Sequence, residues 1–168
     1  MQIIHSKNKD TLAIMKIIND AQRYLAALNI NQWQDGYPNK EQITLDIKNK
    51  DSYIILADDG TVIGTTVFTT KTEPTYQNIN GKWITTNTCC GVIHRLAVDE
   101  AYRKEGLAEF VFNYCEKQLK INGIDSMRID THKDNKGMQH ILTKRGYQYC
   151  GIIILDSGDE RLAFEKVV

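Results

Sequence analysis

A strand, a long helix and a second strand follow one another between residues 91 and 131, and this order constrains the possible folds strongly. The stretch Gly91–Val98 reads G-V-I-H-R-L-A-V, a mixed apolar spacing that is typical of a strand buried on both faces. Glu105–Asn122 is predicted to be helical, because its apolar residues recur at helical spacing and Gly123 is a natural stop. Ser126–Thr131 is the next predicted strand, and since a crossover joins it to the first, the two strands are predicted to be parallel neighbours.

Two helices are predicted before this crossover unit. The first is expected to begin after a cap at Asp10 or Thr11 and to be broken by Asn29–Pro38. Asn39 with Gln42 resembles a capping box at the start of a second, shorter helix. The expected apolar stripe of the first helix comprises Leu12, Ile14, Met15, Ile18, Ala21, Leu25 and Leu28.

The remaining residues are predicted to form hairpins and one more helix. Asp58-Asp59-Gly60 joins two β-rich runs, which is a hairpin signal, and a helix is expected from Asp134 or Asn135 to Gly146. Together these elements predict an α+β fold in which helices cover both sides of a mixed sheet, and at this length one domain over residues 1–168 is the default. The other predicted strands are Gln2–His5, Tyr53–Ala57, Val62–Thr69, Cys150–Leu155 and Arg161–Val167.

Composition excludes several classes of function. The chain has 21 Lys+Arg and 21 Asp+Glu, and its isoelectric point near 6.9 argues against a protein that binds nucleic acid through bulk positive charge. Its apolar runs are far shorter than the ~20 residues of a membrane-spanning helix, and the N-terminus does not resemble a secretory signal. The four cysteines contain no C-x-x-C pair, so we interpret them as reduced thiols of a cytoplasmic protein and expect no metal site.

The turn between the first strand of the crossover unit and its helix carries the clearest chemical signal. It contains Arg103-Lys104-Glu105-Gly106-Leu107-Ala108, an R-x-x-G-x-A pattern at the point where the helix opens. Backbone N–H groups at a helix start lack partners inside the helix and lie at the positive end of its dipole, so a phosphate or pyrophosphate fits there. Gly106 and Ala108 allow phosphates to approach the main chain, and Arg103 and Lys104 add positive charge. The alternative is that Gly106 and Ala108 only allow the helix to pack tightly on the strand.

With this motif, the stretch Val92–Asn122 resembles motif A of the GCN5-related N-acetyltransferase (GNAT) family, whose signature is Q/R-x-x-G-x-G/A. The stretch Asn135–Tyr147 is similar to the next block of the family, an Asn-initiated helix that ends in glycine and an aromatic residue. The strand order also matches, so the resemblance covers essentially the whole chain. It implies the GNAT-like acyl-CoA N-acyltransferase fold and acetyl-coenzyme A (acetyl-CoA) as the cofactor.

The resemblance also implies where the coenzyme binds. Its pyrophosphate is expected on the amides of Lys104–Ala108. Its pantetheine arm is expected between the two parallel strands, where it pairs like an extra strand with the main chain around Leu96 and Val98. Asn135 matches a family position that often contacts the coenzyme. The cofactor-binding residues expected on this basis are Leu96, Ala97, Val98, Arg103, Lys104, Glu105, Gly106, Leu107, Ala108 and Asn135.

Two positions depart from the family pattern. Lys104 stands where the family often has glycine, which changes the loop but keeps its amides. Leu142 aligns with a tyrosine that protonates the departing thiolate in many members, and leucine cannot donate a proton. Tyr147 is the candidate acid in its place, the alternative being that it fills the usual core aromatic position. Water is a further candidate, since a thiolate whose conjugate acid has a pKa of about 8.5 is a fair leaving group.

His94 is the candidate base for acetyl transfer. The amine must be neutral to attack, and a free alkylamine with a pKa of about 10.4 is mostly protonated at neutral pH. His94 lies two residues before Leu96, and residues i and i+2 of a strand share a face. Asp130 on the next strand is the candidate that orients His94, with His132 on the same face. The alternatives are a hydrogen-bonded structural histidine and polar groups at the end of a strand.

Trp33 and Tyr37 are the candidate substrate-binding residues, together with His132. In the GNAT family the connection between the first two helices usually borders the acceptor site, and two aromatic rings beside Asp35 suit a cationic amine. Alternatively, the two rings fill the space between the helices. Tyr76 and Trp83, in a later loop, have the same two interpretations.

The function expected from these observations is acetyl-CoA-dependent N-acetyl transfer to an amine of a small molecule or peptide. One alternative is a non-catalytic acyl-CoA-binding sensor or regulatory module, which Leu142 motivates. Another is an interaction domain in which the Gly106 turn is purely structural. Neither nucleic acid nor a membrane is expected as a partner, and a homodimer is expected from the family alone.

Overall fold

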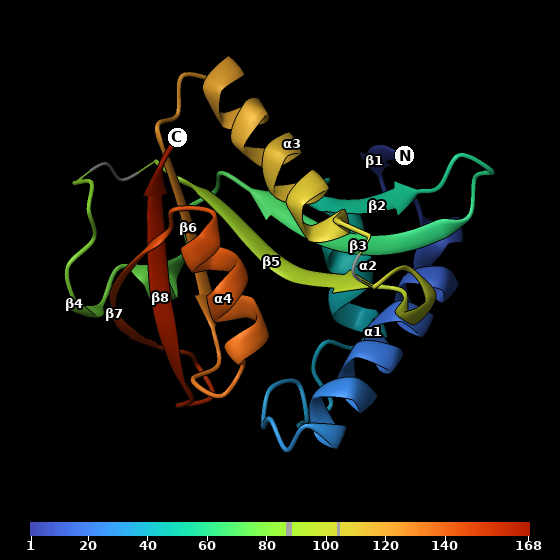
Figure 1. Ribbon diagram of the computed structural model, residues 1–168, viewed down its shortest axis with the longest axis horizontal. Coiled ribbons are helices and arrows are strands. Elements are labelled where there is room, and N and C mark those ends of the chain that lie inside the picture. The colour runs from blue at the N-terminus through green and yellow to red at the C-terminus, as the bar shows by residue number, and fades with distance from the viewer. Residues whose placement is uncertain (87–88, 104) are drawn as a thin grey trace. The chain divides into compact units, whose positions relative to one another are not determined.

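The computed structural model describes residues 1–86, 89–103 and 105–168. Its helices are α1 (Thr11–Ala27), α2 (Lys40–Lys48), α3 (Leu107–Ile121) and α4 (Lys136–Lys144), with short 3-10 helices η1 (Asn8–Asp10), η2 (Pro74–Tyr76) and η3 (Glu100–Tyr102). Its strands are β1 (Gln2–His5), β2 (Ser52–Leu56), β3 (Val62–Thr69), β4 (Ile79–Gly81), β5 (Gly91–Val98), β6 (Ser126–Thr131), β7 (Gln148–Ile154) and β8 (Glu160–Val167). Hydrogen-bonded strands follow the order β1-β2-β3-β5-β6-β8-β7-β4, a mixed α+β architecture (Figure 1).

The described chain separates into two compact units. The first unit comprises Met1–Thr69 and Ile93–Cys115, and the second comprises Thr70–Val92 and Glu116–Val168. Strand β5 and helix α3 each contribute residues to both units. In the part of the chain that the structure describes, no helix combines the length and the apolar character needed to cross a membrane.

In the first unit, β1, β2 and β3 form an antiparallel array. Strand β1 pairs with β2, and β2 pairs with β3, which confirms the predicted hairpin (Figure 1). Gly60 makes the hairpin turn with φ of 85°, a backbone conformation that favours glycine. Helices α1 and α2 share one core with β2 and β5. Its buried members are Ile14, Ile17, Ile18, Ile43, Ile54 and Ala97.

The apolar stripe of α1 differs from the expectation at both ends. Leu12 is 80% exposed and Leu28 is 51% exposed, so their assignment to the buried stripe was wrong. Ile14 and Ile18 are fully buried and Ile17 lies beside them in the core. Successive helical residues are about 100° apart, so Leu12 points away from Ile14, and Leu28 lies beyond the last residue of α1.

Two of the predicted helix caps form their hydrogen bond, whereas Asp10, the N-cap residue of α1, makes no side-chain capping hydrogen bond in the described structure. Asn39 Oδ1 accepts a hydrogen bond of 2.9 Å from the Gln42 amide at the start of α2. Asn135 Oδ1 accepts one of 3.0 Å from the Met138 amide at the start of α4. Helix α3 begins at Leu107 rather than at the predicted Glu105, because the intervening glycine has a positive φ and ends the preceding turn.

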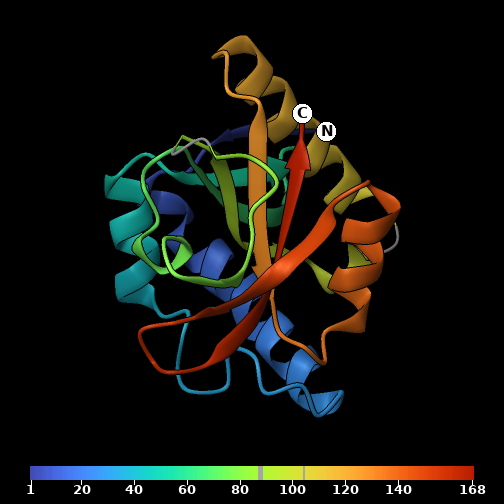
Figure 2. The ribbon, with the colours of Figure 1, turned by 90° about the vertical axis from the view of Figure 1, so that its left-hand side faces the viewer.

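In the second unit, antiparallel pairs join β6 to β8, β8 to β7 and β7 to β4 (Figure 2). Gly91 and Val92 at the start of β5 pair in parallel with Met127 and Arg128 of β6, which confirms the predicted crossover geometry. Strand β4 lies in a stretch for which only a polar loop was expected. Its Gly81 is so close to β7 that an added Cβ would lie 2.1 Å from the Cys150 carbonyl oxygen.

A buried charge cluster holds residues 84–85 to the sheet of the second unit. Glu165 on β8 is fully buried, and its carboxylate accepts hydrogen bonds from Ser126 Oγ at 2.5 Å and Thr85 Oγ1 at 2.6 Å. Arg128 Nε donates to the same carboxylate at 3.2 Å, and its guanidinium lies 4.4 Å from the ring centre of Trp83. Burial acts to raise the pKa of Glu165, but these hydrogen bonds and the Arg128 charge outweigh it, and the pKa is lowered.

Candidate functional site

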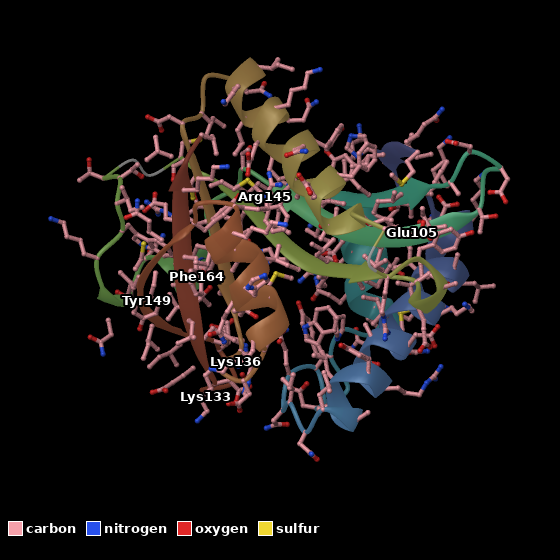
Figure 3. The ribbon with its side chains drawn as sticks, in the orientation of Figure 1. Glu105, Lys133, Lys136, Arg145, Tyr149 and Phe164 are labelled. Atoms are coloured by element: carbon pink, nitrogen blue, oxygen red, sulfur yellow. The ribbon has the colours of Figure 1, made fainter. Side chains whose placement is uncertain are left out.

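The turn between β5 and α3 leaves space beside the main chain. Gly106 has φ of 78°, and apart from its chain neighbours no atom of the described residues lies within 4 Å of a Cβ added there. Glu105 and Gly106 are exposed, and Figure 3 labels the Glu105 side chain at the start of α3. The first N–H groups of a helix have no partner inside it and lie at the positive end of its dipole. The turn can therefore accept an anion on its main chain.

Helix α1 supports the approach to this turn. Asp99 Oδ1 accepts a 3.0 Å hydrogen bond from the Ala101 amide, and Asp99 Oδ2 lies 3.1 Å from Lys16 Nζ on α1. The Ala101 hydrogen bond, with help from the Lys16 charge, lowers the pKa of Asp99. The guanidinium carbon of Arg103 lies 4.0 Å from the ring centre of Tyr24, also on α1. Both ends of the segment 99–103 are thus tied to one helix.

The cofactor-binding residues expected from the sequence divide into two kinds. Ala97 and Leu107 are buried in the protein, with 5% and 2% of their surface exposed. Side chains buried in this way leave only the main chain of these residues for a ligand. Leu96, Val98 and Ala108 are half-buried. The predicted role of Lys104 falls on a residue outside the described ranges.

Arg95 on β5 is the centre of a polar cluster that sequence reasoning missed. Its Nη2 lies 2.9 Å from Asp46 Oδ1 on α2, and its Nη1 donates a hydrogen bond to the hydroxyl of Tyr37. The Arg95 guanidinium also lies 5.8 Å from the Tyr37 ring centre. Gln42 adds a hydrogen bond of 2.9 Å to the Asp46 carboxylate. The available signal was a charged residue beside His94 in an otherwise apolar strand.

The Asp46–Arg95 ion pair is buried and incompletely satisfied. The side chains retain 6% and 11% of their surface exposed. In the described part of the chain, Asp46 Oδ2 and Arg95 Nε have no hydrogen-bond partner. Burial raises the pKa of Asp46, and the charges of Arg95 and His94 only partly oppose this effect. Buried polar atoms that lack hydrogen-bond partners lower the free energy of unfolding, so this ion pair is an unfavourable feature of the first unit.

His94 precedes this arginine and is half-buried. Its carbonyl oxygen accepts a long hydrogen bond of 3.4 Å from Thr66 Oγ1 on β3, and its imidazole is near enough to Asp46 to influence that carboxyl group electrostatically. The spacing argument for a shared face with Leu96 assumed a regular strand. Arg95 between them has φ of 52°, so a shared face no longer follows from the spacing. The role of His94 as a base stays a prediction.

The aromatic residues of the α1–α2 connection have different surroundings. Trp33 packs against the buried core cluster of the first unit, which favours its interpretation as a space-filling residue. Tyr37 is partly buried, and the Arg95 cation lies over its ring. A second cation on that ring face would meet like charge. The geometry therefore does not favour binding of a cationic amine to this face of Tyr37.

In the second unit, Asp130 has a partner of its own. The Tyr76 hydroxyl donates a 2.7 Å hydrogen bond to Asp130 Oδ1, and Trp83 Nε1 donates one of 2.9 Å to the Tyr76 carbonyl. Tyr76 is buried, and burial followed by the Asp130 charge raises its pKa well above the usual range. Tyr76 thus fixes the Asp130 carboxylate. The pairing of Asp130 with His94 stays a prediction.

His132 and Asn135 lie at the loop that leads into α4. His132 is buried, its Nδ1 accepts a 3.2 Å hydrogen bond from the Asp134 amide, and burial together with the Arg161 charge lowers its pKa. Asn135 uses its side-chain oxygen to cap α4. Lys136, labelled in Figure 3, donates from Nζ to the Lys133 carbonyl at 2.8 Å. His132 is therefore held by its own loop, and its assignment to substrate stays a prediction.

The two positions considered for the acid are both inside the protein. Leu142 is fully buried. Tyr147 is 3% exposed, and its hydroxyl donates a 3.2 Å hydrogen bond to Glu116 Oε1 on α3. Glu116 also binds Arg145, labelled in Figure 3, at 3.1 Å and Lys166 at 2.9 Å. These contacts favour the core interpretation of Tyr147, and its role as an acid stays a prediction.

Among residues 1–86, 89–103 and 105–168, no three or more histidine, cysteine, aspartate or glutamate side chains are grouped so that they could hold a metal ion.

Comparison with known proteins gives a consistent result. Residues 14–147 match the model of a family described as "Acetyltransferase (GNAT) family". A crystal structure of a GNAT-family acetyltransferase from Streptococcus agalactiae 2603 is 35% identical, with a TM-score of 0.85 over 99% of this chain and 95% of that chain. No curated protein matches the chain.

Two more distant structures share the fold. One is the PaiA N-acetyltransferase from Thermoplasma acidophilum in complex with coenzyme A, 18% identical, with a TM-score of 0.72 over 99% of this chain and 98% of that chain. The other is the ribosomal-protein-alanine N-acetyltransferase from Brucella melitensis, 14% identical, with a TM-score of 0.70 over 100% of both chains.

Proposed function

This chain belongs to the GNAT family of acetyltransferases, and on that premise we propose that it transfers the acetyl group of acetyl-CoA to an amine of a small molecule or peptide. Acetyl-CoA is the cofactor of this family, and one structure with the same fold contains coenzyme A. The coenzyme supplies a thioester that an amine can attack.

The open turn at Gly106 is the observation that carries the proposal. A diphosphate needs main-chain donors and space for close approach. The start of α3 offers both, since among the described residues beyond its chain neighbours nothing lies within 4 Å of a Cβ built on Gly106. Residues 106–108 would hold the diphosphate through their amides, since the Leu107 side chain is buried and the Glu105 amide already donates to the Tyr102 carbonyl at 3.4 Å. The Arg103 guanidinium, stacked on Tyr24, adds positive charge beside the turn.

His94 is proposed to take the proton that the attacking amine loses. An imidazole titrates near neutral pH, so it can act as a general base under these conditions. Its position on β5, one residue before the Arg95 that binds Asp46, supports this role. The thiolate would leave with a proton from water, because Leu142 has no proton to donate and the Tyr147 hydroxyl is bonded to Glu116.

A second candidate function is supported by Leu142, which stands where many family members have their acid and has no proton to donate. A chain that binds acyl-CoA without transferring the acyl group would keep the Gly106 turn and would not need an acid. The buried Leu142 and the Tyr147–Glu116 hydrogen bond fit this alternative as a sensor or regulatory module.

Two measurements on the wild-type protein separate the candidates. Isothermal titration calorimetry with acetyl-CoA tests binding, and a thiol-release assay over polyamines, amino acids, aminoglycosides and peptides with free N-termini tests turnover. Binding with turnover supports the acetyltransferase, and binding without turnover supports the sensor. If neither calorimetry nor thermal unfolding responds to acetyl-CoA, both candidates are refuted.

A variant then tests the base. His94→Gln is expected to lower kcat by about a hundredfold at saturating amine while the Kd for acetyl-CoA changes little. The loss should become smaller at high pH, where more of the amine is already neutral. A His94→Gln enzyme with unchanged kcat at every pH excludes His94 as the base.

A further inference from the structure

The β5 backbone departs from the extended conformation of a strand at Arg95. Its φ of 52° lies in the left-handed region, inside a strand and at a residue that is neither glycine, asparagine nor aspartate. Such a conformation persists only when the surrounding structure imposes it, and it is concentrated at functional sites in proteins. The side chain of Arg95 shows what imposes it here.

Two segments of the first unit bind the Arg95 side chain. Asp46 from α2 lies 2.9 Å from Nη2, and the Tyr37 hydroxyl from the α1–α2 connection binds Nη1. Gln42, one turn before Asp46 on α2, fixes the carboxylate oxygen that faces Arg95. Arg95 therefore links β5 to α2 and to the α1–α2 connection.

Stability alone does not explain this arrangement. A buried ion pair is commonly no more stable than apolar side chains of similar volume, because desolvation opposes the attraction of the charges. For the Asp46–Arg95 pair the free energy is less favourable still, because Asp46 Oδ2 and Arg95 Nε have no hydrogen-bond partners among the described residues. An arrangement that costs stability in three ways, through strain, burial and unpaired atoms, calls for a geometric reason.

Resting on the proposed function, we propose that Asp46 and Tyr37 are positioning residues that hold Arg95 in its left-handed conformation and thereby orient the adjacent His94 and Leu96 for acetyl transfer. His94 is the proposed base, and Leu96 provides main chain where the coenzyme arm is expected. Release of the Arg95 side chain allows the backbone to extend, and this rotates both neighbours. The Gly106 turn lies outside this linkage, so phosphate binding is retained.

Enzyme kinetics test the proposal first. Asp46→Asn and Tyr37→Phe are expected to lower kcat by about tenfold to a hundredfold, because small displacements of reacting groups have effects of this size. The Kd for coenzyme A should stay within about twofold of wild type. Ile43→Val, which removes a methyl group from a buried residue of α2, is the matched control for simple destabilisation and should leave kcat unchanged.

Conservative replacement of Arg95 gives a second readout. Arg95→Lys keeps a cation for Asp46 and should retain more of kcat than Arg95→Gln. If the variants fold, bind coenzyme A and turn over amine with the wild-type kcat, the positioning role is refuted. An equal fall of kcat in Ile43→Val also refutes it, because destabilisation alone would then explain the loss.

Nuclear magnetic resonance tests whether Asp46 holds the Arg95 backbone, and it needs no measurement of enzyme activity. The three-bond HN–Hα coupling of Arg95 reports its φ, and the amide shifts of His94 and Leu96 report their surroundings. In Asp46→Asn these signals are expected to move toward extended values, while those of Gly60 stay in place. Unchanged signals overturn the inference. A wild-type protein that does not bind acetyl-CoA refutes the proposed function, whereas the NMR result still decides whether Asp46 holds the Arg95 backbone.

Discussion

Replacement of Gly106 by alanine separates backbone strain from coenzyme binding when the same change is made at Gly60. The two glycines have φ values of 78° and 85°, and in the part of the chain that the structure describes an added Cβ at either one meets no atom within 4 Å outside its chain neighbours. The left-handed region disfavours an L side chain by about 1–2 kcal/mol. Each variant should therefore lose about 1–2 kcal/mol of unfolding free energy, a loss that a protein with about 5–15 kcal/mol survives.

The two variants are expected to differ in affinity for the coenzyme. At Gly106 the new methyl group enters the space that we assign to the phosphates, or the turn relaxes and moves the amides of α3. Gly60 lies in the β2–β3 hairpin, which has no proposed role in binding. Gly106→Ala should raise the Kd for acetyl-CoA by about tenfold, equivalent to about 1.4 kcal/mol, and Gly60→Ala should leave it unchanged.

Urea unfolding and isothermal titration calorimetry measure the two quantities separately. Equal losses of stability with a selective loss of affinity in Gly106→Ala support the assignment of the phosphate site. If both variants lose the same stability and both bind acetyl-CoA like wild type, the phosphates are not held at this turn. If both lose the same affinity, the effect comes from stability and the reasoning fails as well.

Further predictions concern stability and the acid. Glu165→Gln should lower the free energy of unfolding in urea by about 3–5 kcal/mol, because it leaves the Arg128 charge buried without its partner. In the wild type, the lowered pKa of Glu165 means that its contribution is fully present above the unfolded-state value of 4.5 and is lost as the pH falls below it, which urea unfolding from neutral to acid pH measures. Gly151→Ala should disrupt the β4–β7 pairing and lower Tm, because the new Cβ would lie 2.3 Å from the Asn80 carbonyl oxygen. Tyr147→Phe should lose about 1 kcal/mol of stability in urea and keep its kcat in the thiol-release assay.

Each of these predictions has a control variant or a result that would contradict it. Glu160→Gln, an exposed change on the same strand as Glu165, should leave unfolding unchanged. Gly158→Ala has the positive φ of a hairpin turn without a close neighbour, so it should lower Tm less than Gly151→Ala. A pH-independent stability would contradict the account of Glu165. A loss of kcat by about a hundredfold in Tyr147→Phe would instead identify Tyr147 as the acid.

Local patterns in the sequence predicted most elements of the fold. The strand–helix–strand order of residues 91–131 indicated parallel strands, and the pairing of Gly91 with Met127 confirms it. Asn39 was predicted as a cap because Gln42 follows it at the spacing of a capping box, and Asn135 was one of the two residues expected to start the last helix. Leu12 was assigned to the stripe although the helical rotation points it away from Ile14, and Leu28 was assigned to it although it lies beyond the last residue of α1.

The polar contacts of the candidate site were less predictable. Asp130 was the candidate to orient His94, and the hydrogen bond that it accepts from the Tyr76 hydroxyl, 54 residues away in the chain, was not predicted. Asp46 was not singled out at all, and it binds Arg95 across 49 residues. Residue spacing does not predict such pairs, because each partner alone resembles an ordinary polar or charged residue on a helix or strand.

The amino-acid sequence by itself determined the order of elements, the glycine turn before α3 and the family resemblance, because each depends on residues close together in the chain. Only the tertiary structure decided which buried charges meet and which backbone residue is strained. The left-handed conformation of Arg95 shows the reason: its energy is unfavourable locally, and contacts from α2 and the α1–α2 connection must form before the chain adopts it.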